Sequence, residues 1–427
     1  MAAAATATVA ASASAQAQGD KIRLGVVGCG RRGRSNLRSV LKLKEDIEVA
    51  AVSEVFKPNL ERTLEMVPGA KVYPDFRELL GDESIDAVLI ATPDHWHAYM
   101  TVEACKAGKD VYVEKPISVT VHEGQMMVKA ARKYGRVVQV GTQQRSGKHF
   151  QEAKDIVQSG RLGAISFVRT WNYSNAYPQG IGQPPDTDPP ADLDWDMWLG
   201  PAPERQFNKN RFGVNPYSFA HFRWFWDYAG GMMTDWGIHL LDIVLWAMAE
   251  QGPRSITTYG GKYALTDNRE TPDTILASYE FPTFVCTYEN RVANAFSGGL
   301  PGYGILFHGT EGTLYVNRQY WEITPETRRY REPEPRVEQR MEGARGRASN
   351  STSDDHWRDF VAAIRNRSKP ICDIEIGHKS TAMALLGNVS LRSRQRVDWD
   401  PVAETTENEE AKTYLSREYR EPWKLEL

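Results

Sequence analysis

Short apolar runs alternate with amphipathic stretches through roughly the first third of the chain. Polar or glycine-rich residues bound each run, as is typical of buried strands, and the runs cover residues 24–27, 47–53, 86–92, 110–113 and 137–141. Helical periodicity lies between them, over 35–43 and 99–107. Strands that alternate with helices predict a parallel sheet with helices on both faces. Residues 21–144 are therefore expected to form a doubly wound α/β domain of the Rossmann type.

From residue 145 the pattern changes to one dominated by strands. A helix over 150–159 precedes an alternating strand over 165–173, and residues 174–220 are rich in Pro, Asp, Asn and Gly, which predicts long loops. Further strands are predicted over 255–263, 274–281, 284–291, 304–308 and 312–316. Residues 145–427 are expected to form a second, α+β domain.

The last part of the chain is predicted to hold two helices and two surface segments. The helices are amphipathic and cover 356–367 and 378–392. Residues 325–350 are dense in Arg, Glu and Pro without an apolar period, which favours a surface insertion or a mobile loop. Residues 403–427 are polar and are expected to wrap over the surface.

The composition limits the classes of protein to which this chain could belong. A chain of 427 residues that is 41% hydrophobic and 25% charged is ordinary for a globular protein, and a net charge of −3 gives no electrostatic case for binding nucleic acid or an anionic membrane. No run approaches the roughly 18 apolar residues of a membrane-spanning helix. The cysteines are scattered without a C-x-x-C pair, which argues against a disulfide framework or a zinc site: Cys29, Cys105, Cys286 and Cys372.

The first 20 residues are rich in Ala, Ser and Thr and contain the sequence Ala15-Gln16-Ala17. This triplet is similar to an A-x-A cleavage site, but no basic segment precedes it. The segment is therefore either a disordered tail or a truncated export signal. The compartment stays open, cytoplasmic in the first case and periplasmic in the second.

A glycine-rich turn follows the first strand and fits the dinucleotide-binding pattern G-x-G-x-x-G. Gly28 permits a tight turn, Gly30 lets the backbone approach a pyrophosphate, and Gly33 allows close packing of helix on strand. Glu54 ends the second strand, where a carboxylate would accept hydrogen bonds from the adenosine ribose. An acid there favours NAD over NADP, although the nearby Lys57 weakens this preference. The alternatives are a glycine turn without a ligand and a solvated glutamate.

The ends of two further predicted strands carry residues that are candidates for binding a ligand. Residues 93–97 (Pro-Asp-His-Trp-His) are expected to form a loop at the carboxyl end of a strand, where open α/β sheets bind ligands. The His-x-His pair has no third metal-ligand candidate nearby, so we expect it to position a cofactor or to pack, and we expect no metal. Glu114-Lys115-Pro116 follows the next strand.

The third candidate stretch is Gly230 to Asp242. Thr234 or Asp235 is expected to cap a helix that runs to about residue 248. Asp235, His239 and Asp242 then share one helical face, and Asp235 could orient the imidazole of His239 and favour its charged form. Such a histidine would serve as a general base. The alternative for an isolated pair of this kind is a capping acid beside a packed histidine.

The glycine pattern, the acid after the second strand, ATPDHWH and VEKPIS together resemble the Gfo/Idh/MocA family of glucose–fructose oxidoreductases and inositol dehydrogenases. The resemblance implies a C-terminal domain built on a large, mostly antiparallel open sheet, with the helix over 378–392 packed back on the nucleotide domain. It also implies sugar or polyol substrates and a homodimer or homotetramer formed through that sheet. Lys115 would reach the nicotinamide and the reacting hydroxyl, and its bond to Pro116 is a candidate cis peptide.

The resemblance also implies a catalytic set of Lys115, Asp235 and His239. In an NAD(P)-dependent dehydrogenase, His239 would take the hydroxyl proton while hydride passes to C4 of the nicotinamide, and Lys115 would stabilise the alkoxide. The cofactor-binding residues expected are Gly28, Cys29, Gly30, Arg31, Arg32, Gly33, Glu54, Thr92, Pro93, His97, Glu114, Lys115 and Gln143. The substrate-binding residues expected are Lys115, Arg145, Trp171, Tyr173, Arg223, Trp224, Asp235 and His239.

The loops over 174–226 are rich in aromatic residues, which either stack on sugar rings or form a small core of their own: Trp195, Trp198, Phe207, Phe212 and Tyr217. Two other functions stay open. One is a redox-neutral enzyme that holds NAD tightly and cleaves a glycosidic bond. The other is a nucleotide-binding protein without catalysis.

Overall fold

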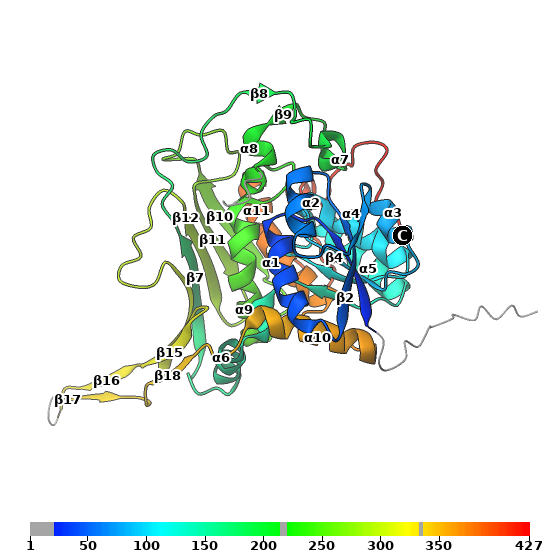
Figure 1. Cartoon of the computed structure of the whole chain (residues 1–427). Coiled ribbons are helices and arrows are strands. Elements are labelled where there is room, and N and C mark those ends of the chain that lie inside the picture. The colour runs from blue at the N-terminus through cyan, green and yellow to red at the C-terminus, as the bar shows by residue number, and fades with distance from the viewer. Residues whose placement is uncertain (1–20, 214–219, 333–335) are drawn as a thin grey trace, which may run out of the picture.

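The computed structural model describes residues 21–213, 220–332 and 336–427. The expectations for residues 1–20 and for Tyr217 therefore lie outside the described residues. Two sheets face each other across a layer of helices (Figure 1). The first sheet carries the N-terminal part of the chain, and the second is built from its middle and C-terminal parts.

The first sheet is parallel throughout, with strand order β3-β2-β1-β4-β5-β6. Its strands are β1 (Ile22–Val27), β2 (Ile47–Ser53), β3 (Lys71–Tyr73), β4 (Ala87–Ile90), β5 (Asp110–Val113) and β6 (Val138–Val140). β4, β5 and β6 are buried throughout, as expected for strands covered by helices on both faces. The strand order reverses between β1 and β4, which places a ligand crevice at their carboxyl ends. This confirms the predicted Rossmann fold.

The helices of this domain are α1 (Arg31–Val40), α2 (Lys57–Leu64), α3 (Phe76–Gly81), α4 (Asp94–Lys106) and α5 (Val121–Lys133). Two of them begin earlier than the sequence predicted. α1 begins directly after Gly30, and α4 begins at Asp94, so the loop expected over 93–97 is wrong. Pro93 occupies the cap position of α4 and Asp94 lies in its first turn, where a negative charge stabilises the helix dipole.

The second sheet has nine strands in the order β18-β15-β14-β13-β7-β12-β11-β10-β19. The pairing is antiparallel except between β7 and β12, which confirms the mostly antiparallel open sheet. The strands are β7 (Ile165–Tyr173), β10 (Ser255–Gly261), β11 (Thr274–Glu280), β12 (Val285–Arg291), β13 (Tyr303–Gly309), β14 (Gly312–Val316), β15 (Tyr320–Pro325), β18 (Ala344–Arg347) and β19 (Val397–Asp398). Its inner face packs on α6 (Lys148–Gln158), α9 (Ile238–Met248) and α11 (Ile374–Ser393).

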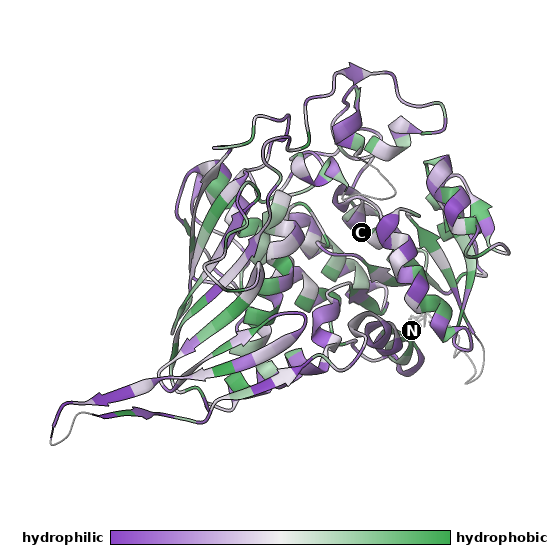
Figure 2. Ribbon diagram, turned by 60° about the vertical axis from the view of Figure 1, so that its left-hand side comes forward, coloured by the Kyte–Doolittle hydropathy of each residue, from purple (hydrophilic) through white to green (hydrophobic). Residues whose placement is uncertain are grey.

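An arm within the segment 325–350 projects from the edge of this sheet. β16 (Thr327–Tyr330) and β17 (Arg336–Gln339) pair as an antiparallel hairpin that extends away from the body (Figures 1 and 2). The described residues of the expected surface segment thus contain a paired hairpin, and β18 beyond it joins the main sheet through β15. An apolar period is missing because the side chains of both strands are almost all exposed, so neither face requires apolar residues.

The loops between β7 and β10 carry short elements: β8 (Asp186–Thr187), α7 (Trp195–Leu199), β9 (Phe207–Asn208) and α8 (Lys209–Phe212). Their aromatic rings pack on one another in a small core of their own. Trp195 lies 4.7 Å from Trp198 and 5.2 Å from Phe207, measured between ring centroids. Trp198 and Phe212 also line the cleft described below.

The C-terminal part of the chain returns to the first domain. α10 (Thr352–Asn366) lays Trp357 flat on Tyr112, with ring centroids 4.2 Å apart, and α11 packs against α5. After α12 (Glu409–Lys412), Trp423 contacts Trp96 at 4.9 Å between ring centroids, and the chain ends beside α3 (Figure 1). None of the helices among the described residues has the length and apolar character to cross a membrane.

Candidate active site

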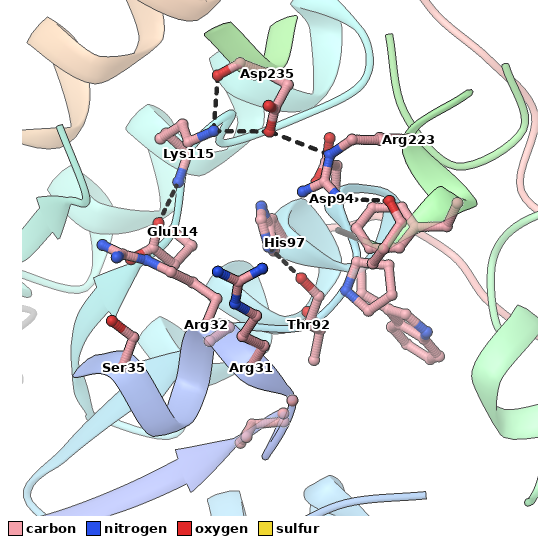
Figure 3. A pocket seen from close by; sticks show the side chains of 18 of the residues that line it. Arg31, Arg32, Ser35, Thr92, Asp94, His97, Glu114, Lys115, Arg223 and Asp235 are labelled. Atoms are coloured by element: carbon pink, nitrogen blue, oxygen red, sulfur yellow. Dashed lines mark hydrogen bonds and ion pairs between the residues drawn. The ribbon is translucent and has the colours of Figure 1, made fainter. Parts of the chain in front are cut away.

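A cleft of about 570 Å³ runs along the carboxyl ends of β1, β2 and β4 and continues to the start of α9. Figure 3 shows it from close by, with residues of the glycine turn below and Lys115, Asp235 and Arg223 above. The cleft is lined by most of the residues expected to bind a cofactor: Gly28, Gly30, Arg31, Arg32, Glu54, Thr92, Pro93, His97, Glu114, Lys115 and Gln143. Asp235, His239 and Arg223 line it as well.

The glycine turn is shaped by steric limits on its backbone. Gly28 has a φ of +91°, and a Cβ there would lie 2.7 Å from the backbone nitrogen of Thr92. A Cβ at Gly33 would lie 2.1 Å from the carbonyl oxygen of Gly28, so Gly33 permits the close packing of α1 on β1 and does not line the cleft. A Cβ at Gly30 would meet nothing closer than 3.9 Å. The turn therefore leaves open backbone at the N-terminus of α1, as a bound pyrophosphate requires.

Glu54 is held at the end of β2 by backbone donors. Its carboxylate accepts hydrogen bonds from the N–H groups of Cys29 at 2.7 Å, Val55 at 2.9 Å and Phe56 at 3.0 Å. Burial raises the pKa of Glu54, and the three N–H donors act in the opposite direction. The Cys29 thiol is buried and outside the cleft, so Cys29 contributes its backbone N–H to Glu54 instead of lining the expected cofactor site.

The centre of the cleft is an ion pair between the two domains. The Lys115 ammonium donates to Asp235 twice, to the carbonyl oxygen at 2.7 Å and to Oδ1 at 3.0 Å, and Arg223 Nε lies 3.2 Å from the same Oδ1 (Figure 3). Burial alone would raise the pKa of Asp235, but the two cations lower it to about 2. The Lys115–Pro116 peptide bond is cis, which confirms that expectation.

A π-helical turn over Met233–Gly237 leads into α9 and includes Asp235. The sequence suggested an ordinary helix in which Asp235 faces His239. A π turn carries an extra residue relative to an α turn, and such turns are frequent at functional sites. Here the Asp235 side chain and carbonyl are directed to Lys115.

His239 lines the cleft in a cationic environment. Burial lowers its pKa, and Lys115, Arg318 and Arg32 lower it further, so the ring is neutral at physiological pH. Its Nδ1 is buried and has no hydrogen-bond partner among the described residues. The expectation that Asp235 favours a charged His239 is therefore wrong, because the Asp235 carboxylate is engaged by Lys115 and Arg223.

The E-K-P segment and the His-x-His pair are held by the surrounding backbone and side chains. Glu114 accepts from Arg32 Nε at 2.7 Å and from Asn36 Nδ2 at 2.8 Å. The ring nitrogens of His97 face the carbonyl oxygens of Pro116 at 2.6 Å and Thr92 at 3.0 Å, so His97 links the ends of β4 and β5. Within the described ranges, no group of three or more His, Cys, Asp or Glu side chains is arranged to hold a metal ion.

Four residues expected at the substrate lie elsewhere. Arg145 forms a buried ion pair with Asp242, at 2.8 Å, so both are structural. Trp171 and Tyr173 lie on the outer face of β7, because Val168 on the same strand packs into the inner core and side chains alternate along a strand. Trp224 packs against the Arg269 guanidinium, 4.4 Å from its ring centroid. The sequence indicated a strand at β7 but not which face of it met the helices.

Several residues that line the cleft were not expected from the sequence, among them Asp94, Trp236 and Arg318. Asp94 lies in the first turn of the helix that follows β4, and this position is the signal that could have identified it. Burial raises its pKa to about 7, although Arg223 and Lys115 act in the opposite direction. Arg318 lies in the turn between β14 and β15, more than 70 residues beyond His239, and no local motif identifies it.

Asp94→Asn is expected to change how stability depends on pH. An unfolded aspartate titrates near pH 4, so between about pH 4 and 7 the folded protein binds more protons than the unfolded chain, and stability falls as pH rises through this window. We expect Asp94→Asn to remove this loss, which amounts to about 4 kcal/mol for a shift of about three pKa units. Urea unfolding at several pH values measures it, with the exposed Asp188→Asn as the control. Equal slopes in wild type and Asp94→Asn would contradict the prediction.

The fold and the cleft define a two-domain protein whose Rossmann domain is shaped to hold a dinucleotide. Sequence models of two domains match the chain, one described as an oxidoreductase family NAD-binding Rossmann fold over residues 22–142 and one as the C-terminal alpha/beta domain of that family over residues 146–268. The chain therefore belongs to the Gfo/Idh/MocA oxidoreductase family.

Among curated proteins, the inositol 2-dehydrogenase of Salmonella typhimurium is 32% identical over 155 residues, which cover 36% of this chain and 46% of that protein. The myo-inositol 2-dehydrogenase of Thermotoga maritima is 29% identical over 157 residues, which cover 37% and 47%. The matched region thus spans under half the length of these relatives.

Solved structures share the fold over most of the chain. The WlbA dehydrogenase of Bordetella pertussis, in complex with NADH and UDP-GlcNAcA, superposes with a TM-score of 0.66 at 20% identity and covers 89% of this chain and 99% of that chain. A levoglucosan dehydrogenase in complex with NADH and levoglucosan gives a TM-score of 0.64 at 18% identity, with coverages of 89% and 99%. At these sequence identities the structural similarity establishes the fold alone.

Proposed function

We propose that this protein is an NAD-dependent dehydrogenase that oxidises a hydroxyl group of a sugar or polyol. The observation that carries the proposal is the meeting of the Lys115 ammonium and the His239 imidazole in one cleft with the glycine turn. The names of the matched inositol dehydrogenases agree with this substrate class.

The residues that line the cleft fit a dinucleotide. The open backbone at Gly30 and the N-terminus of α1 would hold the pyrophosphate, with Arg31 beside it, and Glu54 would accept the ribose hydroxyls. A carboxylate at this position repels a 2′-phosphate, so we propose NAD in preference to NADP. When bound, the nicotinamide supplies the hydride acceptor.

The protein's own groups would hold the substrate hydroxyl and move its proton. An ammonium has three N–H donors, and Asp235 engages two of those of Lys115, so the third is available to a substrate oxygen. That charge-assisted hydrogen bond would stabilise the oxygen as it becomes alkoxide-like. The neutral imidazole of His239 lines the same cleft and would accept the hydroxyl proton. Asp235 acts as a positioning residue for Lys115.

A substrate screen tests the proposal. The purified protein is incubated with NAD or NADP and a panel of pyranoses, polyols and aryl glycosides, and both NADH formation and glycoside cleavage are followed. We expect NADH to form with at least one sugar or polyol. Cleavage of a glycoside without net NADH would replace the proposal, and failure of every substrate to give either product would contradict it.

We also propose that the protein is a homodimer or homotetramer formed through the outer face of the nine-stranded sheet. Phe167, Leu276 and Val285 expose 37%, 47% and 37% of their surface there, and Phe167 and Val285 are direct neighbours on paired strands. Large exposed apolar side chains that cluster on one face are typical of interfaces. Leu276→Glu is expected to dissociate the oligomer in light-scattering measurements. Val402→Glu, at a side chain that is 89% exposed, is the control, and a monomeric wild type would refute the proposal.

A further inference from the structure

Arg318 is presented to the cleft by a rigid turn. It lies between β14 and β15, where Asn317 Oδ1 accepts hydrogen bonds from the N–H groups of Gln319 at 2.8 Å and Tyr320 at 3.0 Å. The carbonyl oxygen of Asn317 lies 3.1 Å from a ring nitrogen of His149. The turn that carries Arg318 is thus fixed by contacts that do not involve the guanidinium itself.

Two contacts orient the guanidinium beside the proposed base. Arg318 Nε donates to Gln144 Oε1 at 3.0 Å, and Gln144 Nε2 donates to the carbonyl oxygen of His239 at 2.8 Å. The guanidinium also lies over Trp236, 4.5 Å from the ring centroid, and the Trp236 ring is 6.0 Å from that of His239. Gln144 and Trp236 thereby hold Arg318 and His239 in one arrangement.

The terminal nitrogens of Arg318 have no carboxylate partner in the described part of the chain. The other cations near His239 are paired, Arg32 with Glu114 and Lys115 with Asp235. Asp235 also pairs with Arg223. Because Nε is engaged by Gln144, the free edge of the Arg318 guanidinium is the end formed by its two Nη atoms, which matches the two oxygens of a carboxylate.

We propose that the substrate is a sugar acid whose carboxylate binds end-on to Arg318 while its reacting hydroxyl lies between Lys115 and His239. This inference rests on the proposed function and names its substrate class. A neutral sugar would leave the Arg318 charge without a partner in the cleft. The cationic environment that lowers the pKa of His239 would likewise attract an anionic substituent.

The test uses matched substrates that differ only at the anionic group: a hexose, its 6-carboxylate, the methyl ester of that acid, and the 6-phosphate. For wild type we expect kcat/KM for the acid to exceed that for the hexose and the ester by about 10- to 100-fold. Arg318→Gln is expected to abolish this preference, so that the acid, the hexose and the ester have similar kcat/KM values. Arg318→Lys should restore only part of it, because an ammonium cannot form the bidentate pair. Arg340→Gln, at an exposed arginine of the hairpin arm, is the control.

Binding measurements separate this inference from the proposed function. Calorimetric titration of the acid into the protein with bound NADH measures the affinity for the acid without turnover. A separate titration of NADH into the protein measures the affinity for the cofactor. We expect Arg318→Gln to weaken binding of the acid and to leave that of NADH unchanged. Equal binding of acid and hexose by wild type, a preference for the phosphate, or a loss of NADH affinity in Arg318→Gln would each overturn the assignment. If the acid binds through Arg318 but no sugar is oxidised, the proposed dehydrogenase function is wrong and the assignment of Arg318 as a carboxylate-binding residue stands.

Discussion

Replacing Lys115 by methionine is expected to lower kcat/KM by about 10³-fold. The variant keeps most of the length of the side chain but removes the ammonium that donates to Asp235 and would hold the substrate oxygen. The loss of a preorganised donor at a developing alkoxide falls mainly on kcat. Steady-state kinetics with the best substrate of the screen measures this effect.

Two further measurements accompany the Lys115→Met variant. Affinity for NADH should change by only a few-fold, because the glycine turn and Glu54 remain. Lys57→Met, at an exposed lysine near the same cleft, should retain wild-type rates. A Lys115→Met enzyme with at least a tenth of wild-type kcat/KM would remove Lys115 from the proposed chemistry.

His239→Asn is expected to lower kcat by about 10²- to 10⁴-fold, the range typical for loss of a general base. The change retains a polar side chain of similar size but cannot accept the hydroxyl proton. Binding of NADH and of a non-reacting substrate analogue should persist, because the Gln144 contact to position 239 uses the backbone carbonyl. His122→Asn, at an exposed histidine, is the control. Undiminished kcat in His239→Asn would show that another group accepts the proton.

The dependence of the rate on pH tests the role of His239 as the base, because the direction in which its pKa is shifted is known. Burial and the neighbouring cations lower the pKa of His239, so the wild-type enzyme should stay active at a pH below the usual pKa of histidine. The acid limb of its pH–rate profile should therefore lie at a lower pH than that of an enzyme whose histidine has an ordinary pKa. Removing the charge of Lys115 should move that limb toward higher pH, since one of the cations that depress the pKa is gone. A limb that stays in place in Lys115→Met would contradict this coupling between the two residues.

The fold was largely predictable because its signals are local. Hydrophobic periodicity and steric limits on the backbone each act over a few consecutive residues. These local signals predicted the glycine turn, the acid after β2 and the buried strands β1, β2, β4, β5 and β6. The E-K-P element and the D-x-x-x-H spacing also identified residues that line the cleft. The short β3 and the hairpin arm were missed, since neither buries a regular apolar face.

Tertiary structure alone decided which of these residues meet. Asp235 is four residues from His239, yet its carboxylate pairs with Lys115, 120 residues away, because the packing of the two domains brings a stronger cationic partner to it. Trp171 faces away from the cleft because α9 packs against the opposite face of β7, which the alternation along the strand does not indicate. Arg318 enters the site through a turn between strands. By itself the sequence determined the elements and the cofactor turn, which depend on neighbours in the chain, whereas the pairing of charges depends on which distant segments fold against one another.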